Sequence, residues 1–271
     1  MPKRKYKALD LSGVAAQLKA ADTLEVGPAV EYSDGGIVFN ERFETKIAGL
    51  YAAGEFVLGP FGANRVFAAI TEVLLQGADA GVNAAKYALS GQSAKIDGEA
   101  LDAMMEAALA PLERSSCHES PAQLRRCIQK RAQADMGPVR NGRDLTAFLD
   151  FIEIVKHDKL PNLGVASKSR VYNKGWFDVL ELKNIVHLLE AATRSALARN
   201  ESRGVHYRED FPYADNDSWL KESLVLLSDG KMHIKHRPVT KTSVALPTGI
   251  QPYRGMMKQM MTAQSDIKGE H

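Results

Sequence analysis

The stretch Gly49-Leu50-Tyr51-Ala52-Ala53-Gly54-Glu55, followed after a short loop by Gly62-Ala63-Asn64-Arg65 and a long apolar run, decides the fold. Leu50–Ala53 is apolar and bounded by glycines, which predicts a short buried strand. Val66–Leu89 has the composition of a helix, and Ser90-Gly91 supplies a C-terminal glycine stop. A strand, a glycine-rich turn and a helix in this order are typical of an α/β protein.

This unit predicts a ligand site at the turn. Ligands of α/β sheets bind at the carboxyl ends of strands, where helix N-termini present free N–H groups and a positive dipole end. Arg65 stands just before the predicted helix, and its planar guanidinium suits a carboxylate. Glu55 places a carboxylate directly after the predicted strand.

The pattern GLYAAGE…GANR followed by an apolar helix resembles the flavoprotein subunits of succinate dehydrogenase and fumarate reductase, with L-aspartate oxidase as a relative. The resemblance implies that Glu55 bonds the adenosine ribose of FAD and that Arg65 clamps a substrate carboxylate. It also implies that the helix start near Ile70 and Thr71 points at the flavin. A helix dipole there would favour an anionic reduced flavin.

Three departures from this family pattern concern the substrate. The family reads P-T-x-H-Y-x-x-G-G-I, with a histidine that touches substrate, and this chain has Glu31 at the histidine position. Glu31 is therefore the second catalytic candidate after Arg65, although a carboxylate repels a dicarboxylate unless it is protonated or paired. Phe61 replaces the histidine before GANR, and the run after Arg65 lacks the usual serine. These changes leave FAD plausible and put succinate or fumarate in doubt as the substrate.

The chain contains no Gly-x-Gly-x-x-Gly turn after a strand. Dinucleotide-binding folds need that turn for close approach to the pyrophosphate. We therefore expect FAD to bind only together with a missing N-terminal half, carried by the same flavoprotein or a partner subunit. An iron-sulfur electron-transfer subunit is a further expected partner, and a small acid the substrate. The alternative is a non-catalytic fragment or subunit that acts by docking the polypeptide with the nucleotide-binding half.

Composition bounds the remaining possibilities. The 271 residues allow one large or two ordinary domains, and the net charge of +2 gives no indication of nucleic-acid binding. No apolar run reaches membrane-spanning length, and the basic N-terminus lacks the apolar segment of a signal peptide. Cys117 and Cys127 have no metal or redox spacing, so we expect free thiols in a cytoplasmic protein and no metal site.

The second half of the chain predicts a mainly helical domain. Three apolar-periodic segments indicate antiparallel helices that form a bundle: a helix opened by Ser120-Pro121, one from Leu145 to Val155, and one from about Trp176 to Arg199. Asp229-Gly230 lies between two alternating runs and predicts a β-hairpin. The fold class is thus mixed: a partial FAD-binding α/β piece at residues 1–91, then a helical domain with hairpin and tail at residues 98–271.

Further motifs in this half resemble the C-terminal domain of the same family. They are MGPVR at 136–140, NKGWFDVLELKN at 173–184 and ESRGVHYREDFP at 201–212. The last motif contains a dense group of charged residues from Arg203 to Asp210, which predicts an ion-pair and capping network that fixes the tail to the body. A catalytic role for His206 is the alternative, because an imidazole titrates near neutral pH.

Overall fold

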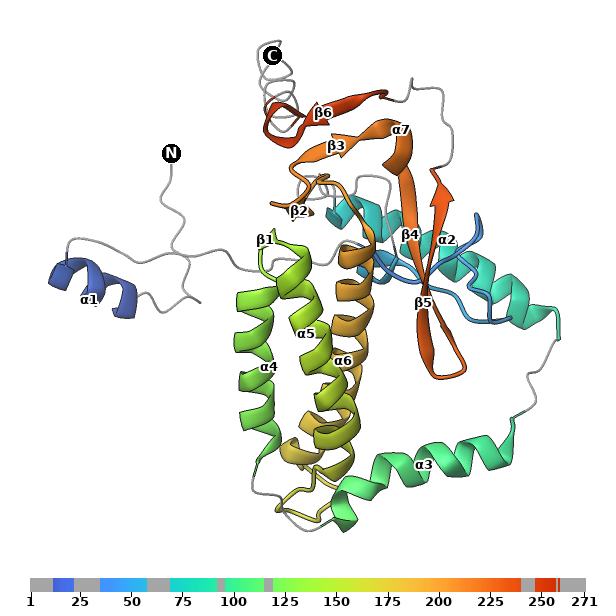
Figure 1. Ribbon diagram of the computed structural model, residues 1–271. Helices are drawn as coiled ribbons and strands as arrows, with labels where there is room; N and C mark the ends of the chain where they lie inside the picture. The colour runs from blue at the N-terminus through green and yellow to red at the C-terminus, as the bar shows by residue number, and fades with distance from the viewer. Residues whose placement is uncertain are drawn as a thin grey trace. The chain divides into compact units, whose positions relative to one another are not determined.

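The computed structural model describes residues 12–21, 35–57, 69–91, 96–114, 119–239, 247–256 and 258. The chain divides into two compact units, which are residues 1–93 and 94–271. Helices dominate both, and the few strands are short, so the predicted mixture of helix and strand is confirmed (Figure 1).

The first unit contains α1 (Ser12–Ala21), the 3-10 turn η1 (Gly54–Phe56) and α2 (Ala69–Leu89). The predicted long helix is thus confirmed over its described part. Gly91 has a φ of 72°, and Ser90 N donates to the carbonyl of Lys86, so the predicted glycine stop is also confirmed.

The predicted buried strand at Leu50–Ala53 is wrong. Tyr51 makes only one isolated bridge to Glu44, and Leu50 is 47% exposed. Ile37, which we expected to begin another strand, also makes a single bridge, to Val57. The described residues of this unit provide no neighbouring ladder for these segments, and an extended segment becomes part of a sheet only when its backbone groups pair along a ladder.

Glycine weakens a helix unless close contact requires it, yet a Cβ at Gly77 or Gly81 of α2 would meet no atom within 4 Å in this structure. By contrast, Gly36 lies at a close approach between two backbone segments. A Cβ there would lie 2.1 Å from the carbonyl oxygen of Phe56.

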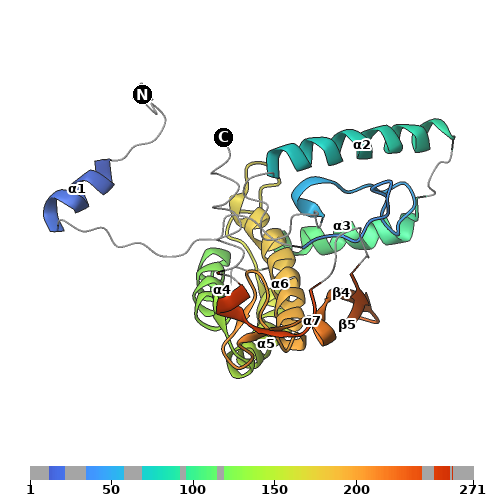
Figure 2. The same cartoon turned by 90° about the horizontal axis from the view of Figure 1, so that it is seen from above.

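The second unit is built on four long helices and two short helical turns (Figure 2). They are α3 (Gly98–Glu113), α4 (Pro121–Asp135), α5 (Gly142–Ile154), the π-helix η3 (Val155–Lys159), the 3-10 turn η4 (Leu160–Asn162) and α6 (Lys174–Ala198). Helices α4, α5 and α6 pack against one another, and α3 contacts α6. Their shared core consists of buried Leu112, Leu124, Ile128, Phe148, Ile152, Val155, Leu160, Leu163, Val165, Val179, Leu182 and Val186.

Side-chain caps determine where these helices begin. Ser120 and Gln123 form a reciprocal capping box at the start of α4, as Ser120-Pro121 predicts. Asn141-Gly142 has the composition of a turn, and in the structure it starts α5, where the Asn141 side chain accepts from Asp144 N at 2.9 Å. Asn173 caps α6 in the same way.

The strands form three two-stranded sheets. β1 (Val139–Arg140) pairs in parallel with β2 (Tyr207–Arg208), and β3 (Tyr213–Asp215) pairs antiparallel with β6 (Ile250–Pro252). β3 leads into the short helix α7 (Asn216–Trp219). The predicted hairpin is confirmed as β4 (Lys221–Ser228) and β5 (Lys231–Pro238). Its two turn residues, Asp229 and Gly230, both have positive φ angles, as a type I′ turn requires.

Two further observations complete the description. Cys127 is a free, half-buried thiol, whereas Cys117 lies outside the described residues. Among the described helices, none is both long enough and apolar enough to cross a lipid bilayer.

Candidate functional site

The Glu55 turn is held against α2 by a short chain of hydrogen bonds. Gly54 has a φ of 78°, which glycine adopts without steric cost, and its N–H donates to Gln76 Oε1 at 2.9 Å. Gln76 Nε2 in turn donates to Glu72 Oε1 at 3.1 Å. Both Gln76 and Glu72 are buried on α2, so a turn and a helix that are twenty residues apart form one local structure.

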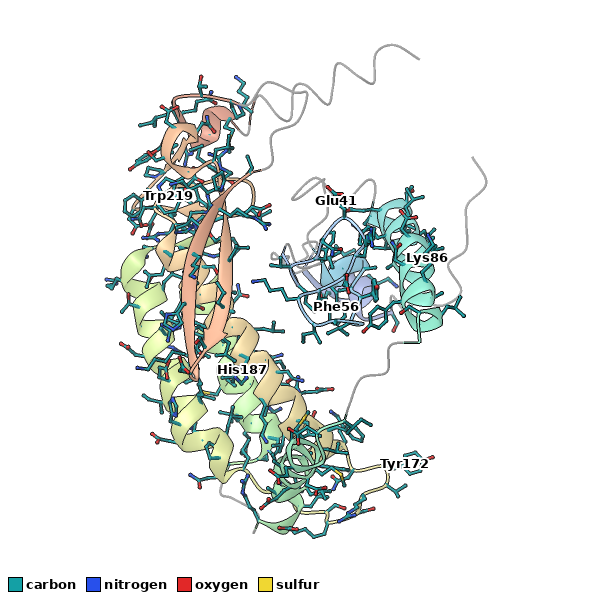
Figure 3. All side chains as sticks on the ribbon, turned by 90° about the vertical axis from the view of Figure 1, so that its right-hand side faces the viewer. Glu41, Phe56, Lys86, Tyr172, His187 and Trp219 are labelled. Carbon is teal, nitrogen blue, oxygen red and sulfur yellow. The ribbon has the colours of Figure 1, made fainter. Side chains whose placement is uncertain are left out.

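The same turn lies beside the Gly35-Gly36 segment. Ile37 N donates to the carbonyl oxygen of Phe56 at 2.7 Å, and Gly36 approaches the Phe56 backbone closely. Two motifs separated in sequence are thereby brought together next to Glu55. The Glu55 side chain is exposed, and Phe56 beside it lies at the surface of the unit (Figure 3).

Ile70 and Thr71 occupy the first turn of α2, where sequence analysis places the helix start. Both are exposed, with Ile70 at 77%. Arg65, Glu31 and Phe61 lie outside the described residues. The structure therefore positions Glu55, Ile70 and Thr71 around one helix–turn pair, whereas the acid-binding role of Arg65 and the catalytic role of Glu31 stay predictions.

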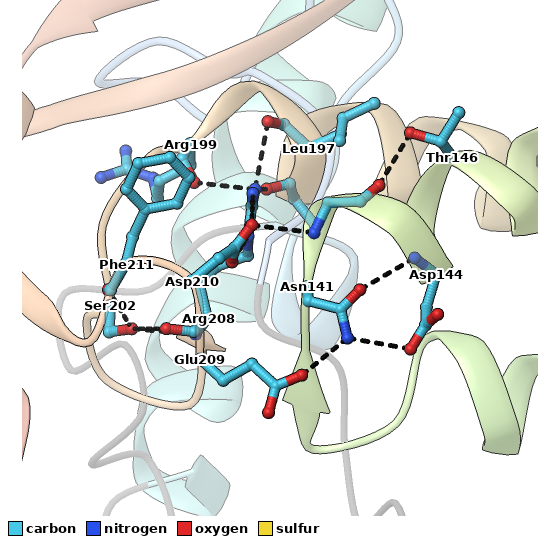
Figure 4. Close-up of polar contacts among 12 residues, drawn as sticks. Asn141, Asp144, Thr146, Leu197, Arg199, Ser202, Arg208, Glu209, Asp210 and Phe211 are labelled. Atoms are coloured by element: carbon cyan, nitrogen blue, oxygen red, sulfur yellow. Dashed lines mark hydrogen bonds and ion pairs between the residues drawn. The ribbon is translucent and has the colours of Figure 1, made fainter.

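The charged motif of the second unit is organised by Arg208, which is 2% exposed (Figure 4). Its Nη1 donates to the carbonyl oxygens of Ala196, Leu197 and Arg199 at 3.1 to 3.4 Å. These carbonyls end α6 and have no partner within the helix. Arg208 therefore caps the C-terminus of α6, where the helix dipole also favours a positive charge.

Asp210 completes this cap and joins it to another helix. Arg208 makes two bonds to the Asp210 carboxylate, at 2.7 and 2.6 Å, and Gly142 N donates to the same carboxylate at 2.9 Å. The hydrogen bond from Arg208, with a smaller contribution from Gly142 N, lowers the pKa of Asp210 to about 2. Asp210 is therefore ionised at neutral pH, and it links the end of α6 to the start of α5.

A second contact reinforces this junction. Asn141 Nδ2 donates to Glu209 Oε1 at 2.7 Å, while Asn141 Oδ1 caps α5 (Figure 4). The backbone also contributes, because Glu209 N donates to the carbonyl of Arg140 at 2.9 Å. The predicted ion-pair and capping network is thus confirmed.

Glu201 forms a separate buried centre in the same motif. Its side chain is fully buried and accepts bonds from Arg199, from Arg203 and from Asp215 N. A buried carboxylate needs paired positive charge and hydrogen bonds. The two arginines and the backbone amide supply both, which fixes β3 to the end of α6.

His206 is neutral rather than poised for acid–base chemistry. Burial, followed by the charge of Arg140, lowers the pKa of His206 to about 4. Its Nδ1 lies 3.2 Å from Arg140 Nη1, so the neutral ring accepts a hydrogen bond from the guanidinium. Arg140 in turn donates through Nε to the carbonyl of Gly137 at 3.0 Å. These contacts favour the structural interpretation of His206 over the catalytic one.

Sequence reasoning missed two links that the structure supplies. The bond from Gly54 to Gln76 carried no sequence signal, because Gln76 is one of several polar residues in this helix. The contact between Arg140 and His206 joins two family-like motifs that lie 66 residues apart. Both links depend on how distant segments pack, which periodicity does not report.

Comparison with known proteins identifies the second unit. Residues 125–253 match a family model described as "Fumarate reductase flavoprotein C-term". The fumarate reductase flavoprotein subunit of Mycobacterium tuberculosis is 34% identical over 230 residues, which cover 82% of this chain and 39% of that protein. The succinate dehydrogenase flavoprotein subunit of Coxiella burnetii is 30% identical over 250 residues, covering 86% of this chain and 40% of that protein.

Solved structures agree with the sequence relatives. A variant of the FrdA protein of E. coli quinol fumarate reductase superimposes with a TM-score of 0.73 at 27% identity, over 80% of this chain and 38% of that one. The Mycobacterium smegmatis Sdh1 complex superimposes with a TM-score of 0.69 at 26% identity, over 79% of this chain and 37% of that one.

The chain spans about two fifths of the length of the curated relatives it matches. The matched family model describes the C-terminal region of these flavoproteins. The chain belongs to the succinate dehydrogenase and fumarate reductase flavoprotein family, of which it carries the C-terminal portion.

Proposed function

We propose that this chain is part of an FAD-dependent oxidoreductase that moves a hydride between the flavin and a small carboxylic acid. Residues 1–91 form the C-terminal part of the FAD-binding domain, and residues 98–271 form the helical domain with its three-helix bundle, hairpin and tail. The observation that carries the proposal is the fumarate reductase flavoprotein C-terminal region at residues 125–253, joined in one chain to the Glu55 turn and α2.

The described residues suit two separate parts of FAD, the adenosine ribose and the flavin. The exposed carboxylate of Glu55, on a turn tied to α2, suits the two hydroxyls of a ribose, which donate hydrogen bonds. The N-terminus of α2 at Ile70 and Thr71 suits a negatively charged flavin edge. FAD, when bound, supplies the hydride chemistry.

The pyrophosphate of FAD needs a further element, because the sequence has no Gly-x-Gly-x-x-Gly turn. The nucleotide-binding half of the flavoprotein, in the same polypeptide or in a partner subunit, supplies it. A flavin that is reduced and reoxidised in each turnover also needs an electron donor or acceptor besides the substrate. An iron-sulfur subunit of a cytoplasmic complex fills that role. The relatives are flavoprotein subunits, which supports such an assembly.

The substrate is a small acid bound by Arg65, and Glu31 is the second catalytic candidate. Glu31 replaces a histidine that touches substrate in the family pattern, and Phe61 replaces the histidine before GANR, which together disfavour an unmodified dicarboxylate such as succinate. Because the guanidinium of Arg65 offers a two-point grip, one carboxylate on the substrate is enough for recognition.

Two substitutions test this proposal in the assembly that contains the nucleotide-binding half. Glu55→Gln should empty the flavin site, which the loss of the flavin absorption band reports. Arg65→Lys should leave flavin content unchanged and lower turnover of the acid by roughly 1–3 kcal/mol in transition-state stabilisation, the range for hydrogen bonds to charged groups.

The opposite pattern would reject these assignments. If Arg65→Lys removes flavin while turnover per bound flavin stays intact, Arg65 belongs to the cofactor site or to the fold. An assembly that includes the nucleotide-binding half but stays colourless favours the alternative function, a non-catalytic subunit that acts by docking.

A further inference from the structure

The turn that carries Glu55 is fixed at both of its ends. Gly54 N donates to Gln76 Oε1 on α2 at 2.9 Å, and Val57 N closes the turn by donating to the carbonyl of Gly54 at 3.1 Å. Val57 is fully buried and forms a bridge to Ile37. Glu55 therefore stands exposed between two anchored residues, which leaves its backbone little freedom to change direction.

The amide of Gln76 is oriented by a second side chain of α2. Its Nε2 donates to Glu72 Oε1 at 3.1 Å, one helical turn earlier. An ionised carboxylate only accepts hydrogen bonds, whereas a side-chain amide has one accepting and one donating end. Glu72 therefore draws the donating end of the amide, and the accepting oxygen faces Gly54 N. Glu72 orients Gln76, and Gln76 holds Gly54.

Burial makes this arrangement costly to maintain without a purpose. The exposed fractions are 6% for Glu72 and 7% for Gln76. An apolar side chain at position 76 would pack in the same place without needing hydrogen-bond partners. What the amide adds is an acceptor for Gly54 N, so its contribution falls on the turn rather than on the packing of α2.

We propose that Gln76 is a positioning residue for the cofactor, which holds the turn so that the Glu55 carboxylate meets the ribose hydroxyls of FAD in one orientation. This inference rests on the proposed function. A hydrogen bond weakens steeply when its angle departs from linear, so the direction of the carboxylate matters. A carboxylate that is already held in the productive direction loses less conformational freedom on binding, and it binds more tightly for that reason.

The alternative is a purely structural role, in which Gln76 only attaches α2 to its own unit. The chain offers a matched control for that role in Asn83, which also lies on α2. Asn83 Nδ2 donates to the carbonyl of Arg42 at 3.3 Å, a bond that attaches α2 to the same unit without involving the Glu55 turn. Substitution of Asn83 therefore reproduces a structural loss without a positioning loss.

The test compares the wild type with Gln76→Met, Asn83→Leu and the double variant Glu72→Gln with Gln76→Glu. Methionine resembles glutamine in size and removes both polar ends. The double variant exchanges the carboxylate and the amide, so it keeps one charge and allows both hydrogen bonds. Hydrogen exchange of the Gly54 amide is measured by NMR in the full chain. The dissociation constant of FAD is measured by fluorescence quenching in the assembly that contains the nucleotide-binding half.

We expect Gln76→Met to speed exchange of the Gly54 amide by about tenfold or more and to weaken FAD binding by about tenfold. Asn83→Leu should leave both quantities at their wild-type values, even where it lowers the thermal unfolding temperature as much as Gln76→Met does. The double variant should return both quantities to within about threefold of the wild type, because the Gly54 N–H again has an acceptor.

FAD binding of wild-type strength in Gln76→Met, with the Gly54 amide exposed to exchange, overturns the inference and leaves the proposed function standing. A Gly54 amide that stays protected in this variant overturns it as well, and so does an equal loss of FAD binding in Asn83→Leu. A double variant that regains amide protection without regaining FAD binding also counts against it. A wild-type assembly that binds no FAD rejects the proposed function, and the inference with it.

Discussion

At the scale of single residues, the best-defined feature of this chain is a buried charge that is compensated by hydrogen bonds and an ion pair. Arg208 is almost fully buried, and its guanidinium is divided between Asp210 and three carbonyls at the end of α6. Removing one partner of such a group leaves an uncompensated charge in the interior, which costs several times more than a surface ion pair is worth. The motif that carries Arg208 therefore belongs to the stability of the domain.

The pH dependence of stability tests whether His206 is buried in its neutral form. Its pKa is lowered from 6.5 to about 4 in the folded chain, first by burial and then by Arg140. Between these values the unfolded chain binds a proton that the folded chain does not. The free energy of unfolding should therefore decrease as pH falls from about 6.5 to about 4, by on the order of 1–3 kcal/mol. Urea unfolding of the wild type across this range, set beside His206→Gln, measures the slope.

The glutamine variant should lose most of this slope, because its amide oxygen accepts from Arg140 without titrating. His187→Gln is the matched control, since His187 is exposed on α6 and should leave the slope as it is in the wild type. A slope that persists in His206→Gln would contradict the buried, neutral state of this imidazole.

At the scale of elements, α6 organises the second unit because both of its ends are fixed by side chains. Its C-terminus is closed by Arg208, and its N-terminus by Asn173, which is 5% exposed. Asn173 Oδ1 accepts from Trp176 N at 3.1 Å, and its Nδ2 donates to the carbonyls of Ser167 and Ser169. One side chain thus starts the helix and orders the loop before it.

Asn173→Ala should destabilise the chain by about 2–3 kcal/mol, because it removes the cap of α6 together with two hydrogen bonds to the carbonyls of Ser167 and Ser169. Ser120→Ala removes only the more exposed cap of α4 and should cost about 1 kcal/mol. Chemical denaturation followed by far-UV circular dichroism compares the two. Equal costs would show that the loop bonds of Asn173 contribute nothing.

At the scale of the whole molecule, the apolar core is concentrated in one unit. All twelve residues of the core cluster lie between Leu112 and Val186. In the described part of residues 1–93, the buried apolar side chains are Val57 and Ala80. The buried apolar surface of these described residues is by itself too small to offset the conformational entropy lost on folding.

We therefore expect residues 94–271, expressed alone, to unfold in one cooperative transition close to that of the full chain. Residues 1–93 alone should show no cooperative transition. Thermal scans by circular dichroism of the two pieces and the full chain decide this. A cooperative transition in the first piece, or its loss in the second, would show that the units depend on each other.

The sequence by itself determined the elements whose signals are local. The helix start at Ser120, the glycine stop after α2 and the Asp229-Gly230 turn all follow from which backbone groups a nearby side chain can satisfy, or from which residues accept a positive φ. The family was also determined by sequence, since the GLYAAGE…GANR and ESRGVHYREDFP motifs can be recognised without coordinates.

Only the tertiary structure decided what these elements pack against. The bridge between Ile37 and Val57, the bond from Gly54 to Gln76 on α2 and the bonds from Arg208 to the end of α6 all join segments that are separate in the sequence. An apolar run shows that a face will be buried but not which partner covers it. Hydrophobic burial is non-directional, so the partner is decided by the packing of the assembled molecule.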